Sequence, residues 1–350
     1  MVTSPKIKAS LPPGLIVSLG KTVWQTLWQI MMGQLAPSDD AGAYTRPTSE
    51  FRHKVESEGK YTPDSGRYRL IVGMGCPWAH RTLVTRALKG LEAAIPTWRV
   101  SPAPNEGVWR FDNPGLEWRS LPELYQTARN GYRGRSTVPV LWDTHTRTIV
   151  NNESAEIIQI LNVAFNNVAQ QPQRDLYPSE WQETVDIWND RIYHAVNNGV
   201  YRCGFARTQA AYEVACQKLF DTLAVIDQQL ARQRYLCGDR LTLADVRLFT
   251  TLFRFDVVYH GLFKCDRQRL RDYPQLWPYA RDIYQQPGVA ATCDLNTIRR
   301  EYYGNLFPLN PGGIVPLGPN PADWQQPHQR ETRQPIATAA IASAQATTAP

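Results

Sequence analysis

Short apolar runs and a helical repeat alternate along the first half of the chain. An apolar run of about five residues suits a buried strand, whereas apolar positions every three or four residues indicate a helix. The predicted elements, in order, are a strand at 68–72, a helix from Pro77 to Gly90, a strand at 95–100, a short helix near 120–129, strands at 138–142 and 148–150, and a helix from Asn152 or Glu153. The stretch after residue 100 is rich in Pro and Gly and predicts irregular structure. The order of these elements predicts an α/β domain.

The second half shows helical spacing almost throughout. Four segments carry apolar positions at a 3.6-residue period, and they are 180–198, 209–233, 242–260 and 275–286. The third segment begins with a capping box, in which Thr242 is the N-cap and Asp245 follows three residues later. The sequence therefore predicts an all-helical second domain.

The chain ends differ in composition from these two domains. The sequence divides into an N-terminal arm (1–50), the α/β domain (51–168), the helical domain (178–310) and a tail (311–350). The tail is first rich in Pro and Gly and then, from Ile336, almost entirely Ala and Thr. Such a segment has little apolar surface to bury, so we expect it to be disordered.

The N-terminal arm contains a helical pattern from Leu15 to Leu35, which Lys21 and several Gln residues interrupt. It falls short of the ~20 apolar residues of a membrane span. The apolar run from Leu15 to Leu19 is also too short for a secretory signal, which needs ~7–15 residues. We expect an amphipathic arm that packs on the body of the protein or on a dimer partner, and contact with a membrane surface is the alternative.

Composition narrows the classes of function. The net charge of +6 is spread along the chain and gives little support to nucleic-acid binding. The His and Cys residues do not fall at ligand spacings, so no metal site is predicted. Six cysteines without a CxxC pair predict free thiols in a reducing compartment, and hence a cytoplasmic protein. The 16 Tyr and 11 Trp outnumber the 10 Phe, and aromatic side chains with a polar tip suit interfaces and flat organic ligands.

Cys76 is the strongest candidate for a catalytic residue. It follows a predicted strand and a Gly-Met-Gly stretch, and Pro77 suits the first position of a helix. The sulfur would lie at the helix N-terminus, where free N–H groups and the helix dipole favour a thiolate. An inert buried Cys is the alternative. Because Ala79 stands where a dithiol motif has its second Cys, we expect a mixed disulfide with an external thiol, released by a second thiol.

Two further motifs predict the rest of a pocket for a small γ-glutamyl-cysteinyl thiol. Val138 and Pro139 open a strand and leave an edge free for an extended peptide. If their peptide bond is cis, the Val138 backbone would face the cysteinyl part of the ligand. Glu153 can pair with an α-ammonium group, while the Ser154 hydroxyl and the helix N–H groups hold an α-carboxylate. Alone, each motif also fits an edge-strand proline or an ordinary helix cap.

Several longer motifs occur in a fixed order between about residues 50 and 319. They include Gly75-Cys76-Pro77-Trp78-Ala79-His80-Arg81-Thr82, the runs 134–143, 148–154, 196–201 and 254–259, and Ile314-Val315-Pro316-Leu317-Gly318-Pro319. These motifs resemble those of the glutathionyl-hydroquinone reductases, the Xi class of glutathione transferases. The resemblance implies a thioredoxin-like domain followed by an all-helical domain, usually in a homodimer, with glutathione as co-substrate.

The resemblance also implies a reaction and its residues. Cys76 would attack the glutathione sulfur of a glutathionyl-hydroquinone, which releases the hydroquinone and leaves a Cys76–glutathione disulfide. A second glutathione would then reduce this disulfide and form oxidised glutathione. The positions that match glutathione-holding residues of the family are Trp109, Arg135, Val138, Pro139, Glu153 and Ser154. The positions that match tyrosines facing the aromatic substrate are Tyr193, Tyr259 and either Tyr302 or Tyr303.

The chain departs from the expected family pattern near the substrate. Glu301 and Leu306 stand where His is expected, and Ser101 replaces the His of a Val-His-Pro segment. Two other interpretations stay open. One is an Omega-like thioltransferase or dehydroascorbate reductase that uses the same Cys76. The other is a non-catalytic binding protein with the glutathione-transferase fold.

Overall fold

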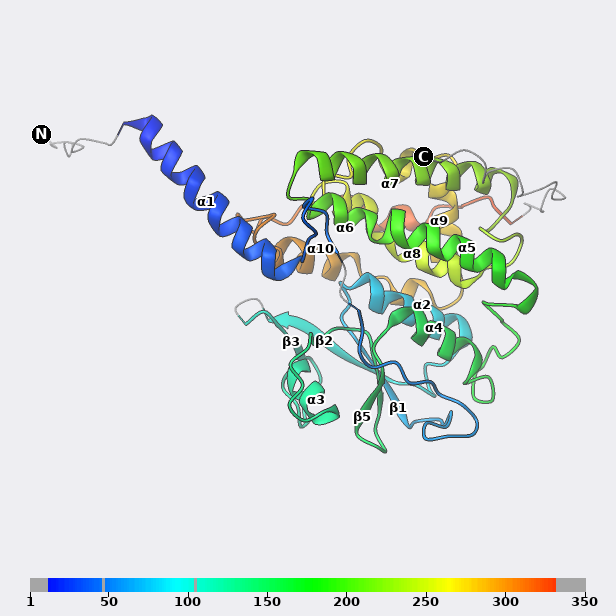
Figure 1. Ribbon diagram of the computed structural model, residues 1–350. Helices are drawn as coiled ribbons and strands as arrows, with labels where there is room; N and C mark the ends of the chain where they lie inside the picture. Colours follow the sequence, from blue (N-terminus) through cyan, green and yellow to red (C-terminus); the bar gives the residue numbers. More distant parts are fainter. Residues whose placement is uncertain (1–11, 46–47, 104–105, 332–350) are drawn as a thin grey trace, which may run out of the picture.

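A mixed sheet with its own helices lies beside a larger helical bundle in the computed structural model, which describes residues 12–45, 48–103 and 106–331 (Figure 1). The tail from Ile336 onward lies outside the described residues. Two hydrophobic clusters form the core, one between the sheet and its helices and one within the bundle. The two clusters match the two halves that the sequence pattern separates.

The sheet has five strands in the order β3-β2-β1-β4-β5. The strands are β1 (Tyr68–Val72), β2 (Thr97–Ala103), β3 (Val108–Phe111), β4 (Val140–Asp143) and β5 (Thr148–Asn151). β1 runs parallel to β2 and antiparallel to β4, and the outer pairs are antiparallel. The apolar run of β1 reflects its central position, since Leu70 pairs with Thr97 on one side and Leu141 on the other.

One strand was missed from the sequence. Residues 108–111 form β3, where irregular structure was predicted, and β2 extends to Ala103 to pair with it. Gly107 supplies a positive φ of 66° at the turn before β3. A four-residue strand is too short for its alternation to stand out among Pro and Gly residues, and pairing with β2 stabilises it instead.

Three helices cover the sheet, namely α2 (Pro77–Lys89), α3 (Leu121–Ala128) and α4 (Ser154–Val163). α2 and α4 pack on each other, and α2 also contacts helix α8 of the bundle (Figure 1). α3 contacts β3 and β5. The N-terminus of α2 therefore lies where the sheet meets the bundle.

The bundle contains α5 (Gln182–Ile192), α6 (Gly199–Gly204), α7 (Gln209–Arg232), α8 (Leu243–Arg254), α9 (Leu276–Tyr284) and α10 (Leu295–Asn305). Two of the predicted helices are not uniform, because α5 and α8 each continue into a π-helical turn, at Tyr193–Asn197 and Phe255–Tyr259. The predicted capping box of Thr242 and Asp245 is confirmed. α10 was not predicted, and short 3-10 turns lie at 179–181, 270–272, 290–292 and 321–325.

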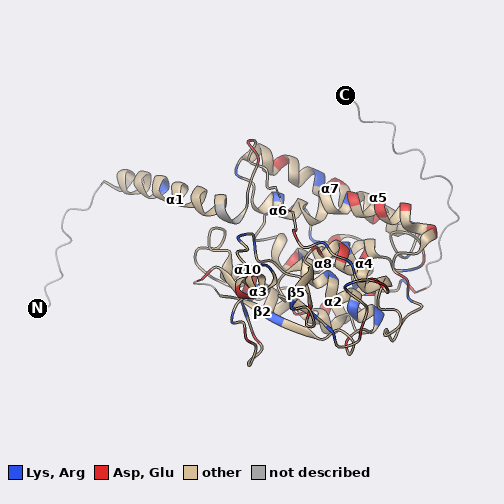
Figure 2. Ribbon diagram, turned by 60° about the horizontal axis from the view of Figure 1, so that its bottom comes forward, with Lys and Arg blue, Asp and Glu red and all other residues tan. Residues whose placement is uncertain are grey.

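The N-terminal arm forms a long helix, α1 (Pro13–Leu35), that extends away from the body (Figure 1). Its C-terminal half contacts the protein along one face, where Met32 is buried, Trp28 packs against the bundle core and the ring of Trp24 meets that of Phe307. Its other apolar side chains, such as Ile16, Val23 and Ile30, are about half exposed, and Lys21 is the single charge on the helix (Figure 2). Among the described helices, none has both the length and the apolar character that crossing a bilayer requires. The predicted helix is confirmed, and its outer apolar surface remains uncovered in the single chain.

Candidate active site

A cavity of about 600 Å³ lies between the sheet domain and the bundle. Its walls come from the N-terminal side (Tyr44 and residues 48–50), the start of α2, the β2–β3 hairpin, the loop before β4, α6 and α10. This volume is within the range of small-molecule pockets in proteins. Cys76 lines the cavity, so the candidate nucleophile has access to a ligand of moderate size.

Local sequence places Cys76 at the edge of α2. Cys76 is the N-cap residue with extended φ and ψ of −73° and 119°, and Pro77 occupies the first helical position. The thiol is half-buried, and its Sγ lies 3.7 Å from the carbonyl oxygen of Val138, to which it donates a hydrogen bond. The Val138–Pro139 peptide bond is cis. Two of the sequence motifs thus meet at one sulfur atom, at a helix N-terminus that favours a thiolate.

Arg254 connects the bundle to the loop that carries Cys76. This fully buried side chain comes from the end of α8. Its Nε donates to the carbonyl of Gly75 at 2.9 Å, and an Nη donates to that of Met74 at 3.1 Å. The other Nη donates to the carbonyl of Thr250 and lies 3.0 Å from Nδ1 of His80. The guanidinium thereby fixes the backbone just before the nucleophile.

Three tyrosine hydroxyls meet on the bundle side of the cavity. The Tyr302 hydroxyl lies 2.7 Å from that of Tyr201 and 3.2 Å from that of Tyr259. Tyr201 and Tyr302 line the cavity, whereas Tyr259 is fully buried behind them. Burial raises the pKa of all three hydroxyls, which therefore stay protonated and able to donate hydrogen bonds near neutral pH.

The other two candidate tyrosines lie outside the cavity wall. The half-buried ring of Tyr193 packs edge-on against Trp78, with 6.1 Å between the ring centroids. The hydroxyl of Tyr303 lies next to Gly261. Neither residue is among those that line the cavity. Of the two adjacent tyrosines on α10, it is Tyr302 that faces the cavity.

The candidate glutathione residues divide into two groups. Trp109, Arg135 and Val138 line the cavity. The ring of Trp109 covers Gly73 so closely that a Cβ on Gly73 would lie 2.5 Å from it, which explains a glycine at this position.

Pro139, Glu153 and Ser154 are not among the residues that line the cavity. Glu153 caps α4, where its carboxylate accepts hydrogen bonds from the Ala155 amide at 3.1 Å and from the Ser49 hydroxyl at 3.0 Å. Pro139 and Ser154 are buried. The cavity-lining Ser49 thus connects Glu153 to the wall of the site.

Comparison with known proteins identifies the family. Models of the glutathione S-transferase N-terminal and C-terminal domains match residues 75–164 and 209–282. The glutathionyl-hydroquinone reductase YqjG of Escherichia coli is 43% identical over 330 residues, which cover 89% of this chain and 97% of the relative. The crystal structure of the glutathione-S-transferase Xi from Phanerochaete chrysosporium aligns with a TM-score of 0.78 at 43% identity, covering 81% of this chain and 95% of that chain. The chain belongs to the Xi class of glutathione S-transferases.

A third relative agrees with this assignment. The glutathionyl-hydroquinone reductase PcpF of Sphingobium chlorophenolicum is 42% identical, covering 85% of this chain and 94% of the relative. The glutathione-bound structure of the Escherichia coli protein aligns with the Xi-class chain at a TM-score of 0.77 and 44% identity, covering 82% of this chain and 98% of that chain. The predicted fold class, a thioredoxin-like domain followed by an all-helical domain, is confirmed.

Several residues that line the Xi-class cavity were given no role from the sequence, among them Tyr44, Ser49 and Tyr201. Glu301 was noted only as a departure from the family pattern near the substrate, and it also lines the cavity. Tyr44 and Ser49 belong to the segment predicted to be an arm outside the domains, and no local signal marks them. Glu301 is half-buried on α10, and its Oε2 accepts a hydrogen bond from the amide of Gly75 at 2.9 Å. Burial raises the pKa of this carboxyl to about 7.

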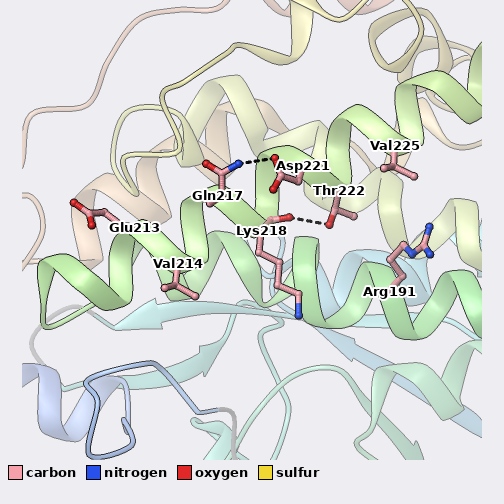
Figure 3. A pocket seen from close by; sticks show the side chains of 8 residues that line it. All are labelled: Arg191, Glu213, Val214, Gln217, Lys218, Asp221, Thr222 and Val225. Atoms are coloured by element: carbon pink, nitrogen blue, oxygen red, sulfur yellow. Dashed lines mark hydrogen bonds between the residues drawn. The ribbon is translucent and has the colours of Figure 1, made fainter. Parts of the chain in front are cut away.

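A second cavity of the Xi-class chain, about 800 Å³, is an open groove between α5 and α7 (Figure 3). Its side chains pair along α7, where the Gln217 amide donates to Asp221 and the Thr222 hydroxyl donates to the carbonyl of Lys218. The groove contains no thiol and shares no lining residue with the Cys76 cavity. Within the described residues, no group of three or more His, Cys, Asp or Glu side chains is placed to hold a metal ion.

Proposed function

We propose that this chain is a glutathionyl-hydroquinone reductase, which converts glutathionyl-hydroquinones to hydroquinones through a Cys76–glutathione disulfide. One observation carries the proposal. The Cys76 sulfur, at the N-terminus of α2, opens into a cavity of about 600 Å³ whose opposite side presents the hydroxyls of Tyr201 and Tyr302. The names of the Escherichia coli and Sphingobium relatives support the choice of substrate.

The proposed reaction has two steps, a displacement at the thioether sulfur and a thiol–disulfide exchange. In the first step, the Cys76 thiolate attacks the glutathione sulfur, and the electron pair of the carbon–sulfur bond leaves with the ring carbon, which takes up a proton. Hydroquinone departs and the Cys76–glutathione disulfide remains. In the second step, the thiolate of another glutathione attacks this disulfide, releases oxidised glutathione and restores the Cys76 thiolate. The ring carbon is reduced, and the sulfur of the conjugate and the thiol of one free glutathione end as one disulfide.

The binding roles in this proposal follow the two sides of the cavity. The residues that hold the glutathione part are Trp109, Arg135, Val138, Pro139, Glu153 and Ser154. Trp109, Arg135 and Val138 line the cavity, and Glu153 contacts the cavity-lining Ser49. On the bundle side, Tyr302 donates a hydrogen bond to the oxygen of the substrate ring, supported by Tyr201 and Tyr259. The structure gives less support to direct contact by Tyr193, since its ring packs against Trp78 outside the cavity wall.

We also propose that the enzyme works as a homodimer in the cytoplasm. The homodimer rests on the resemblance to the family. The six cysteines are all free, which supports a reducing compartment.

The test compares two substrates and two cysteine variants. The purified protein is given glutathione with either a glutathionyl-hydroquinone or a glutathione mixed disulfide, and release of hydroquinone is measured by chromatography. We expect hydroquinone release to be the faster reaction, and we expect Cys76→Ser to reduce it by more than about 10³-fold because the nucleophile is lost.

Cys237→Ser is the matched control. Cys237 is a half-buried thiol outside the cavity, and its replacement leaves both rates unchanged. Efficient disulfide reduction without hydroquinone release would establish the Omega-like thioltransferase instead. Hydroquinone turnover that survives Cys76→Ser would contradict the proposed chemistry altogether.

A further inference from the structure

The two proposed steps leave Glu301, a carboxyl group in the wall of the reaction cavity, without a role. Glu301 comes from α10 and reaches across the domain boundary to the loop that carries Cys76. Its Oε2 accepts the hydrogen bond from the Gly75 amide, one residue before the nucleophile. Within the described part of the chain, Oε1 has no hydrogen-bond partner. The carboxyl can therefore keep its contact with the loop through one oxygen and carry a proton on the other.

The groups around Glu301 keep that proton in place near neutral pH. The pKa of this carboxyl is raised to about 7; burial is the largest cause, and the charges of Asp112 and Asp294 also raise it. The Gly75 amide and the Arg254 guanidinium, which is bonded to the Gly75 carbonyl on the other side of the loop, act in the opposite direction. The other titratable or charged side chains that line the same cavity are Tyr44, Glu50, Cys76, Tyr132, Arg135, Tyr201 and Tyr302. The result is a carboxyl that both donates and accepts protons in the physiological range.

The proposed reaction requires such a group. When the carbon–sulfur bond breaks, the ring carbon receives an electron pair and must receive a proton. The hydroxyls of Tyr201, Tyr259 and Tyr302 are poor sources, since burial raises the pKa of each of them above its ordinary value. General acids act best when their pKa lies near the working pH, and Glu301 meets that condition inside the same cavity.

We propose that Glu301 is the acid that protonates the ring carbon of the substrate as the carbon–sulfur bond breaks. This proposal rests on the proposed reductase function. The Cys76 thiolate forms a bond to the glutathione sulfur, the carbon–sulfur pair moves to the ring carbon, and the Glu301 proton joins that carbon. Glu301 is then a carboxylate, which takes the thiol proton of the second glutathione as its thiolate attacks the Cys76–glutathione disulfide. Atoms and charges balance, because the proton of one glutathione thiol ends on the hydroquinone ring.

The proposal separates two reactions that share the nucleophile. Cleavage of a mixed disulfide expels a thiolate, which needs no proton on carbon. Glu301 should therefore matter far more for carbon–sulfur cleavage than for sulfur–sulfur cleavage at the same Cys76. A purely structural role in holding the Gly75 loop would affect both reactions alike.

The experiment replaces Glu301 by Gln, whose side-chain oxygen can still accept the Gly75 hydrogen bond. Hydroquinone release and cleavage of a glutathione mixed disulfide are both measured in single turnovers without added glutathione, for the wild-type protein and for Glu301→Gln. The step with the second glutathione, which the two reactions share, then enters neither rate. We expect hydroquinone release to fall about 10²-fold, the usual contribution of a general acid, and to fall at least 30-fold more than disulfide reduction. Glu180→Gln makes the same chemical change at an exposed ion pair with Arg240 outside the cavity, and both rates should remain at wild-type values.

The pH profile supplies a second readout that a structural role would not change. In the wild-type protein, hydroquinone release falls as pH rises through about 7, because the acid loses its proton. Disulfide reduction lacks this decline, and Glu301→Gln removes it from hydroquinone release. If Glu301→Gln does not fold, the presence or absence of this decline in the wild-type protein alone decides the question.

Three outcomes are distinguishable. Wild-type protein that releases no hydroquinone overturns the proposed function itself. If the wild-type protein releases hydroquinone and Glu301→Gln slows hydroquinone release and disulfide cleavage equally, the residue positions the loop and the acid role is overturned. If Glu301→Gln releases hydroquinone at the wild-type rate and with the same decline at alkaline pH, the acid role is overturned as well.

Discussion

Tyr302 connects the cavity to the buried core of the bundle, since its hydroxyl contacts both the cavity-lining Tyr201 and the buried Tyr259. A hydroxyl held on two sides is restricted in orientation, so it can point a hydrogen bond at a substrate oxygen without first being ordered. Its neighbour Tyr303 has the same chemistry and similar burial but lies outside the cavity wall. The two residues make a matched pair for testing the proposed role.

Replacement of Tyr302 by Phe should lower kcat for hydroquinone release by about 10–100-fold, because one preorganised donor is lost from the transition state. Tyr303→Phe should change kcat less than about threefold. Steady-state kinetics of the two variants provide the measurement. Equal losses in both variants would contradict the assignment of Tyr302 to the substrate side.

Glu301 also affects the pH dependence of stability. Its pKa is 4.5 for an ordinary glutamate and about 7 in the folded protein, where burial is the main cause of the increase. Below about pH 4.5 the carboxyl is neutral in both states and contributes no difference. As the pH rises toward 7 the unfolded chain loses the proton first, so the folded state becomes less stable by roughly 3 kcal/mol, and this loss persists at higher pH.

Glu301→Gln avoids that cost, because Gln has no charge to bury. We expect the variant and the wild type to have similar free energies of unfolding near pH 4.5. At about pH 8 the variant should be more stable by roughly 3 kcal/mol. Urea denaturation at the two pH values measures this difference. A difference that does not change with pH would contradict the raised pKa.

The loop between β1 and α2 depends on a helix that is distant in the sequence. Arg254, at the end of α8, follows Met74 and Gly75 by 180 and 179 residues in the sequence, yet it donates hydrogen bonds to the carbonyls of both. A single planar guanidinium reaches both carbonyls and the α8 backbone at once, which the ammonium group of a Lys cannot reproduce. The position of Cys76 therefore depends on the packing of α8 against α2.

Replacement of Arg254 by Lys should lower the free energy of unfolding by about 3 kcal/mol, because buried carbonyl groups lose their donors. Arg240→Lys is the control, since Arg240 and Glu180 form an exposed ion pair, and its effect should stay within about 0.5 kcal/mol. Chemical denaturation at neutral pH provides the comparison. An Arg254→Lys protein as stable as the Arg240→Lys control would contradict this account of the loop.

The sequence was sufficient to predict those elements whose conformation depends on their own residues. The apolar run of β1, Pro77 after Cys76, and the capping box of Thr242 each predict a feature that the structure contains. Local signals failed where a distant partner stabilises the element. β3 depends on its pairing with β2, and the π-helical turn at Phe255–Tyr259 interrupts a pattern that predicts one continuous helix.

The site was only partly predictable for the same reason. Cys76, Val138 and Tyr302 were found because motifs or the family resemblance mark them. The contact of Glu301 with Gly75 joins residues 226 positions apart, and Tyr44 comes from a segment that the sequence assigned to an arm. Such contacts depend on how the two domains pack, which periodicity along the chain does not describe.

The cavity as a whole forms where the two domains and the N-terminal segment meet. The sheet domain supplies Cys76 and Val138, the bundle supplies Tyr201 and Tyr302, and Tyr44 completes the wall from the N-terminal side. The nucleophile and the hydrogen-bond donors thus come from different domains. The proposed reaction requires both, because one side holds glutathione and the other holds the ring that leaves.

A single-turnover experiment tests the central claim most directly. The protein, freed of glutathione, is mixed with less than one equivalent of a glutathionyl-hydroquinone, and released hydroquinone and the mass of the intact and digested protein are measured together. The account predicts one hydroquinone for each glutathione bound through a disulfide, with that disulfide at Cys76. Hydroquinone released without a glutathione adduct on Cys76, or an adduct on another cysteine, would contradict it.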